Sequence, residues 1–101
     1  MAHAFQLLLM QSDESKHLYR ARYDNVREAF LVLDEALSTV QPSNENGVTV
    51  GDLRLSMNDG NIHGSVSGGV NREDFALSAS HLAYQWKKLG FPPAEVRKFF
   101  S

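Results

Sequence analysis

The sequence contains no cysteine, which excludes disulfide bonds and thiolate metal sites. This absence fits a reducing compartment, so we expect a cytoplasmic protein. Proline occurs only three times, and no apolar run approaches the ~20 residues that a membrane-spanning helix needs. The apolar segment 4–10 has no basic segment before it and is soon followed by Asp13 and Glu14, so we expect no secretory signal peptide.

The sequence also lacks a large excess of charge of either sign. Ten Lys and Arg residues against twelve Asp and Glu residues give a net charge of −2. Dedicated nucleic-acid-binding domains are usually basic, so the balance disfavours that class while leaving room for a local basic face. The hydrophobic fraction of 43% and charged fraction of 22% are typical of a globular fold, and the length predicts one domain, residues 1–101.

The sequence also lacks catalytic and cofactor-binding motifs. It has no GxSxG nucleophile elbow, no GxxxxGK[ST] phosphate loop and no GxGxxG fingerprint. Ser80 and His81 are adjacent, so on a helix they project about 100° apart and form no dyad. The four histidines, His3, His17, His63 and His81, have no metal-ligand spacing. We therefore expect no enzymatic activity, no cofactor and no metal site.

One segment leaves a ligand site open as an alternative. His63 lies in the glycine- and serine-rich segment Gly60–Gly69, and Gly68-Gly69 precede a predicted helix whose first N–H groups could hold an anion. The more ordinary interpretation is that these glycines let a strand bend and a helix approach closely.

The strongest pattern in the sequence is an apolar repeat at steps of three and four residues between Ser12 and Val40. It predicts one long amphipathic helix, capped at Ser12 and stopped by Pro42. The repeat also fits a short heptad seam, but packing on a sheet is favoured over a helix-mediated dimer. The stripe consists of Tyr19, Tyr23, Val26, Phe30, Leu33, Leu37 and Val40.

The remaining elements are expected on either side of that helix. Residues 4–10 fit a strand, although their composition also suits a helix. After a loop over 42–47, alternation predicts a strand over 48–57 with a bulge at Gly51-Asp52, a turn at 58–61 and a return strand over 62–67.

The last third of the chain predicts a second helix and a short third one. Apolar residues from Phe75 to Leu89 repeat at helical spacing between Asn71, a capping residue, and Gly90, a terminating residue. A short helix is expected from Pro93. The predicted fold is therefore a two-layer α+β sandwich in the order β-α-β-β-α-α, with a three-stranded, mostly antiparallel sheet and two main helices on one face.

Basic and tyrosine side chains supply the only candidate binding surface. We expect a small non-enzymatic module that binds another protein, such as a bacterial or viral regulator, inhibitor or accessory protein, through an Arg/Tyr-rich face of the first helix. The alternative is a nucleic-acid-binding regulator that uses the same basic clusters. A homodimer is also expected, because Phe91, Phe99 and Phe100 suggest an apolar patch near the end of the sequence. The candidate partner-binding residues are Lys16, Tyr19, Arg20, Tyr23, Arg27, Lys87, Lys88, Arg97 and Lys98.

Overall fold

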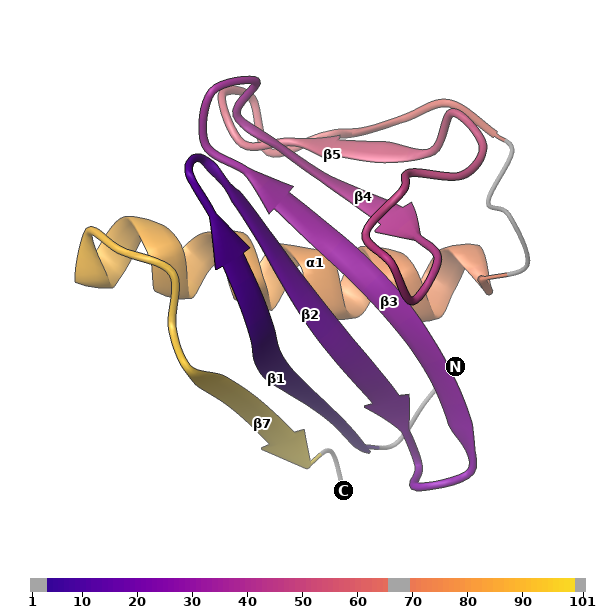
Figure 1. Ribbon diagram of the computed structural model, residues 1–101. Helices are drawn as coiled ribbons and strands as arrows, with labels where there is room; N and C mark the ends of the chain where they lie inside the picture. The colour runs from indigo at the N-terminus through magenta and orange to yellow at the C-terminus, as the bar shows by residue number, and fades with distance from the viewer. Residues whose placement is uncertain (1–3, 66–69, 100–101) are drawn as a thin grey trace.

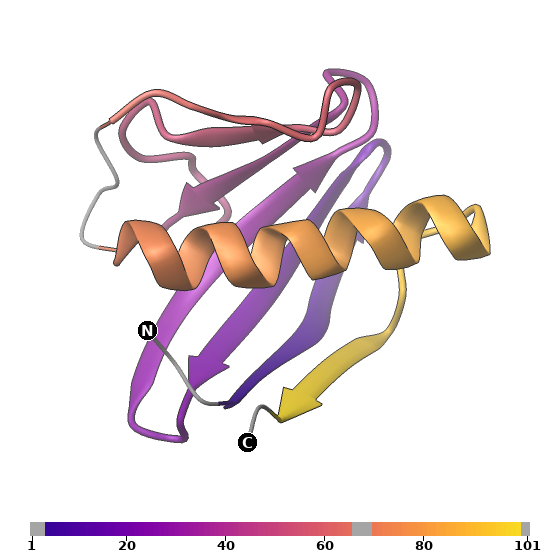
Figure 2. The same ribbon diagram turned by 180° about the vertical axis from the view of Figure 1, so that it is seen from behind.

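The computed structural model describes residues 4–65 and 70–99 and shows one antiparallel sheet with one helix lying across one of its faces (Figures 1 and 2). The seven strands follow the order β6-β5-β4-β3-β2-β1-β7. Strands β1 to β6 form a meander, and β7 returns after the helix to pair with β1. The elements are β1 (Ala4–Asp13), β2 (Lys16–Tyr23), β3 (Arg27–Asp34), β4 (Thr39–Ser43), β5 (Arg54–Ser56), β6 (Ile62–His63), α1 (Arg72–Leu89) and β7 (Glu95–Phe99).

The prediction of a three-stranded sheet with two main helices is wrong, because the predicted long helix over 12–40 is strand. The segment contains the end of β1, all of β2 and β3, and the start of β4. Tyr19 and Tyr23 are four residues apart, a spacing that puts them on one face of a strand as well as of a helix. Val26 and Leu37, which the helix would have buried, lie in turns and are 79% and 66% exposed. No helix-mediated dimer seam can form from this segment.

Tight turns that contain no glycine interrupt the predicted helix. Asp24 and Asn25 both have positive φ, at 56° and 61°, as a type I′ hairpin turn requires. Glu14 and Ser38, in the turns on either side, each have a φ of 56°. The Asp34 carboxylate accepts hydrogen bonds from two backbone N–H groups of the β3–β4 turn. Each turn reverses the chain, so consecutive strands pair antiparallel.

The strand predicted at residues 4–10 is confirmed and continues to Asp13. In the predicted three-stranded sheet this strand could pair only with the central hairpin, over 48–57 or 62–67, but its neighbours are β2 and β7. Gly51-Asp52, where a bulge was predicted, form a bend outside the strands. A register shift occurs instead in β1, between Leu9 and Gln11.

The central hairpin is confirmed only in outline. The predicted strand 48–57 is reduced to β5 with an isolated bridge at Thr49, and the loop predicted over 42–47 starts later, at Asn44. Gly60 has the expected positive φ of 73° in the turn. The return strand is β6, and residues 66 and 67 of the prediction lie outside the described residues.

The second predicted helix is confirmed as α1. Asn71 caps it by accepting hydrogen bonds from the N–H groups of Glu73 and Asp74, and Gly90 ends it with a φ of 81°. Its buried stripe of Phe75, Ala79 and Leu82 packs against the sheet. The short helix expected from Pro93 is wrong, because β7 occupies that segment.

The core lies between α1 and the sheet face that it crosses (Figure 2). Alternate residues of β1, β2 and β3 enter it, as Leu7, Tyr19 and Leu31 show with no exposed surface. Because successive strand residues point to opposite faces, the intervening residues are directed to the other side of the sheet. That other side, which faces the viewer in Figure 1, has no helix over it among the described residues.

Candidate interaction surface

The sheet face opposite α1 presents a row of side chains set by strand register. Leu8 on β1 lies opposite Arg20 on β2, and Arg20 lies opposite Phe30 on β3. Paired residues in antiparallel strands point to the same face, so these three side chains are neighbours. We call the surface around this row the open face. It comprises Gln6, Leu8, Arg20, Arg22, Glu28, Phe30, Glu95 and Arg97.

A loop covers the adjoining part of this side of the sheet. Leu18 and Val32 point the same way as Arg20 but are only 9% and 4% exposed. The loop 44–50 folds back over them, and a Cβ placed on Gly47 would lie 3.9 Å from Leu18 Cδ1. Asn44 holds this loop by accepting hydrogen bonds from two of its backbone N–H groups. The open face is therefore the part of this side of the sheet that the loop 44–50 leaves exposed.

Arg20, at the centre of the open face, has a guanidinium that makes no ion pair or hydrogen bond with the described side chains. Its side chain is half-buried, and its Nε is buried without a hydrogen-bond partner in the described part of the chain. Arg22 and Arg97, beside it, are paired with Glu28 at 3.5 Å and Glu95 at 3.4 Å. An unsatisfied buried donor costs about 1–3 kcal/mol, so Arg20 is the least satisfied group of this surface.

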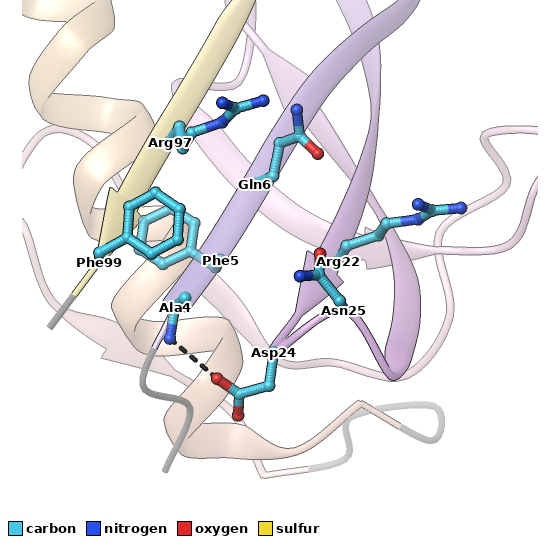
Figure 3. A pocket seen from close by; sticks show the side chains of 8 residues that line it. All are labelled: Ala4, Phe5, Gln6, Arg22, Asp24, Asn25, Arg97 and Phe99. Carbon is cyan, nitrogen blue, oxygen red and sulfur yellow. Dashed lines mark hydrogen bonds between the residues drawn. The ribbon is translucent and has the colours of Figure 1, made fainter.

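A cavity of about 230 Å³ adjoins the open face at the ends of β1, β2 and β7 (Figure 3). Arg22 and Arg97 come from strands on either side of Gln6, whose Nε2 donates to Glu95 Oε2 at 2.6 Å. Asp24 also lines the cavity. Carboxylates thus accompany both arginines, and the cavity has the mixed polarity of a surface hollow rather than of an anion site.

The two tyrosines predicted to bind a partner are buried on the opposite side, beneath α1. Tyr19 donates a hydrogen bond to the Pro93 carbonyl at 2.6 Å, and the Tyr23 hydroxyl lies 2.8 Å from Ser78 Oγ. Burial raises the pKa of Tyr23 to about 12 and also raises the pKa of Tyr19. Tyr19 thus bonds to the connection between α1 and β7, and Tyr23 bonds to α1 itself, so neither is available to a partner.

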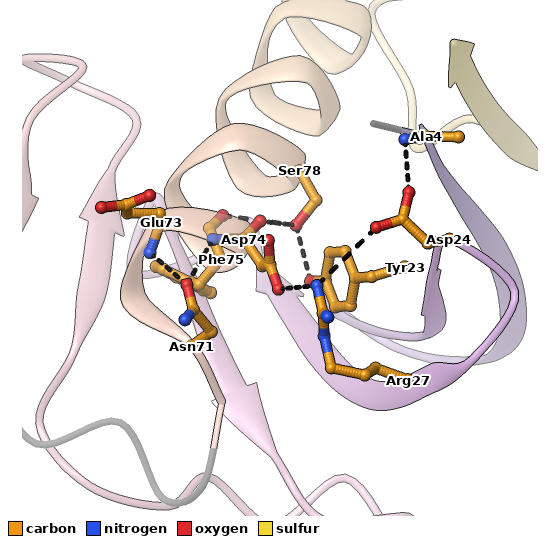
Figure 4. A network of polar contacts seen from close by, with 9 residues as sticks. All are labelled: Ala4, Tyr23, Asp24, Arg27, Asn71, Glu73, Asp74, Phe75 and Ser78. Atoms are coloured by element: carbon orange, nitrogen blue, oxygen red, sulfur yellow. Dashed lines mark hydrogen bonds and ion pairs between the residues drawn. The ribbon is translucent and has the colours of Figure 1, made fainter. Parts of the chain in front are cut away.

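Arg27 also faces the helix layer, where it completes a polar network (Figure 4). Its Nη2 donates to Asp74 Oδ2 at 2.6 Å and lies 4.0 Å from Asp24. The Asp74 side chain is 2% exposed, so Arg27 neutralises a buried carboxylate in the first turn of α1. Asp74 and Tyr23 meet in the same network through Ser78, which also donates to the Asp74 carbonyl.

The other predicted residues are spread over the molecule. Lys16 points to the same side as the open face but lies beyond the loop 44–50. Lys87 and Lys88 occupy the last turn of α1, and Lys98 alternates with Arg97 to the other side of β7. Sequence reasoning missed Leu8 and Phe30 as members of one surface. Leu8 and Phe30 each lie in an apolar run, in β1 and β3 respectively, so no local pattern joined them to Arg20 before the register was known.

His17 and His63 both take part in side-chain hydrogen bonds. His17 is buried between Ser12 Oγ at 2.8 Å and Glu35 Oε1 at 2.7 Å, and Trp86 Nε1 donates to the other Glu35 oxygen at 3.0 Å. The hydrogen bond from Trp86, and to a smaller extent the one from His17, holds the pKa of Glu35 below its usual range. His63 lies 3.1 Å from Asp59.

Across residues 4–65 and 70–99, no group of three or more His, Asp or Glu side chains could hold a metal ion. Gly68-Gly69 lie outside these ranges.

No protein-family model, curated protein or solved structure matches this chain. Within the described residues, no helix is both long enough and apolar enough to cross a membrane.

Proposed function

We propose that this chain is a non-enzymatic protein-binding module, a regulator, inhibitor or accessory protein, and that it binds its partner through the open face. The observation that supports this proposal is Arg20, a half-buried arginine whose Nε has no hydrogen-bond partner among the described residues. The strand register places it between Leu8 and Phe30. This surface replaces the Arg/Tyr-rich helix face expected from the sequence, because that helix does not exist and its tyrosines are buried.

Binding would use the exposed part of the Arg20 side chain, because its Nε is buried and out of a partner's reach. The strand register places Arg20 between Leu8 and Phe30, and its side chain is half-buried, so little further side-chain freedom would be lost in a complex. A partner carboxylate could accept two parallel hydrogen bonds from it in the geometry that arginine favours. Arginine is also enriched at the energetic centres of protein interfaces.

The charges of the open face favour an acidic partner. Glu28 and Glu95 balance Arg22 and Arg97, which leaves the charge of Arg20 uncompensated at the centre. Leu8 and Phe30 add half-buried apolar surface on either side of it. We therefore propose a partner segment in which Asp or Glu stands next to apolar residues.

Peptide-display selection on the folded protein tests this proposal without a known partner. We expect peptides with Asp or Glu beside apolar residues to be enriched. Arg20→Ala should weaken their binding about tenfold or more, and Arg20→Lys should restore only part of it because lysine lacks the planar fork. The matched control is Arg72→Ala, an exposed arginine at the start of α1 that should bind as the wild type does.

Two results would contradict the proposal. One is a selection without acidic enrichment, and the other is undiminished binding by Arg20→Ala with an unchanged melting temperature. The alternative, a nucleic-acid-binding regulator, remains a prediction from the sequence. It requires a mobility shift of DNA or RNA at about 50 mM salt that weakens steeply as salt is added.

A further inference from the structure

The outer edge of β7 offers backbone groups with a fixed pattern. The N–H of Leu9 donates to the carbonyl of Ala94 at 2.9 Å, which makes these two residues a hydrogen-bonded pair of the β1–β7 ladder. Backbone groups in an antiparallel strand point alternately to its two neighbours. The N–H and C=O groups of Val96 and Lys98 are therefore directed to β1, and those of Glu95, Arg97 and Phe99 are directed outward.

This edge is the larger of the two that the sheet presents. β7 ends the strand order with β1 as its single neighbour, whereas β6 at the other end has only two residues (Figure 1). The side chains of β7 alternate in charge along the side that carries the open face, with Glu95 followed by Arg97. A strand that adds to this edge must accommodate both charges.

We propose that β7 pairs antiparallel with β7 of a second copy of this chain, with the two-fold axis at Val96. In this register Glu95 of each copy lies opposite Arg97 of the other, and the outward backbone groups of these residues form the ladder. The two sheets then join into one, and both open faces lie on the same side of it.

Charge selects this register from the other two-fold arrangements of β7. A two-fold axis at Arg97 would place Arg97 opposite its own copy, and axes at Glu95 or Lys98 would do the same for those residues. Like charges directly opposite each other destabilise an antiparallel pair, whereas opposite charges contribute about 0.2–1 kcal/mol. Charged side chains on edge strands commonly block association, but here they are complementary when the strand meets itself.

The expected dimer is weak because the contact is short. β7 has five residues, so the pairing buries less surface than a stable interface of about 1,200–2,000 Å². We expect a monomer–dimer equilibrium with a dissociation constant in the micromolar range or above, measurable by sedimentation between about 10 µM and 1 mM.

Charge exchange provides the test. Glu95→Arg and Arg97→Glu each place like charges opposite each other, so each single variant should sediment as a monomer at 1 mM. An equimolar mixture of the two variants should dimerise, because each then meets its opposite. The double variant Glu95→Arg/Arg97→Glu should regain the wild-type association, because each charge again lies opposite its opposite.

Folding and partner binding are separate readouts. The melting temperature of each variant under dilute, monomeric conditions controls for the loss of the intrachain contacts of Glu95 with Arg97 and Gln6. Arg20→Ala should dimerise normally, so failure of the open-face proposal leaves this one standing. A wild type that stays monomeric at 1 mM overturns the inference. A dimer that both single variants retain also overturns it, since association would then use another surface.

Discussion

Replacing Arg27 by alanine should cost far more stability than the same change at Arg22, although both arginines belong to the β2–β3 hairpin. Arg27 Nη2 lies 2.6 Å from the carboxylate of Asp74, whose side chain is 2% exposed. The Arg22–Glu28 pair spans 3.5 Å, and its side chains are 47% and 46% exposed. Burial of the acceptor, rather than the presence of an ion pair, sets the difference.

The magnitudes follow from the two environments. A hydrogen bond to a charged group contributes about 1.5–3 kcal/mol, and Arg27→Ala also leaves a buried carboxylate without this partner. Because the Arg27 side chain is itself 53% exposed, water can replace part of the loss, and we expect about 2 kcal/mol. Arg22→Ala should cost about 0–0.5 kcal/mol, as exposed ion pairs do.

Urea denaturation of the wild type, Arg27→Ala and Arg22→Ala at neutral pH measures both costs. For a domain of this size, 2 kcal/mol corresponds to a melting temperature lower by about 8–16 °C. The double variant Arg27→Ala/Asp74→Asn should be less destabilised than the sum of its two single variants, because no buried charge then lacks its partner. Equal losses from Arg27→Ala and Arg22→Ala would refute the reasoning.

Three further predictions concern pH and backbone conformation. Because the folded-state pKa of Glu35 is lowered, the stability that its carboxylate gives the fold is complete above about pH 4.3 and is lost as pH falls through the lower folded pKa. Urea denaturation from pH 3 to 7 should show this loss in the wild type and a flatter pH dependence in Glu35→Gln. Because the folded-state pKa of Tyr23 is raised to about 12, the stability that its neutral hydroxyl gives the fold is complete below about pH 10 and is lost as pH rises towards 12. The difference in free energy of unfolding between the wild type and Tyr23→Phe should therefore shrink from pH 10 to 12. Gly64→Ala should lower the melting temperature more than Gly60→Ala: both have positive φ, but a Cβ at Gly64 would lie 2.2 Å from the Asp52 carbonyl oxygen, whereas none of the described atoms lies within 4 Å at Gly60.

The sequence predicted elements correctly where strong capping or turn residues bounded them. Helix α1 has a capping Asn71, a terminating Gly90 and a buried stripe between them, so local signals and tertiary packing agree. The turn around Gly60 was predictable for a similar reason, because glycine readily adopts positive φ.

The misread segment contains no glycine or proline at the turns that interrupt it. The turn residues Asp24 and Asn25 adopt positive φ without glycine, and Ser38 does the same in the next turn, so a continuous helix appeared acceptable. Glu28 and Ala29 individually favour helix, but pairing with neighbouring strands outweighs local propensity in a sheet.

The candidate surface was predictable only through its arginines. Arg20 was selected from the sequence as a binding residue, and it lies at the centre of the open face. Tyr19 was selected beside it but points the other way, because neighbouring residues of a strand occupy opposite faces. Leu8 and Phe30 come from separate strands, and only the register brings them to Arg20.

The pairing of β7 with β1 has a consequence for how the molecule assembles. Residues 4 and 99 lie opposite each other, whereas the hairpins from β1 to β4 join neighbouring parts of the chain. Contacts between distant segments require a large loop to close, so they form slowly compared with local hairpins. During synthesis on a ribosome, the meander of β1 to β6 can form before β7, the second pairing partner of β1, has been made. During that interval Leu7 would lack the cover of Val96, leaving the nascent chain open to mispairing until the last strand emerges.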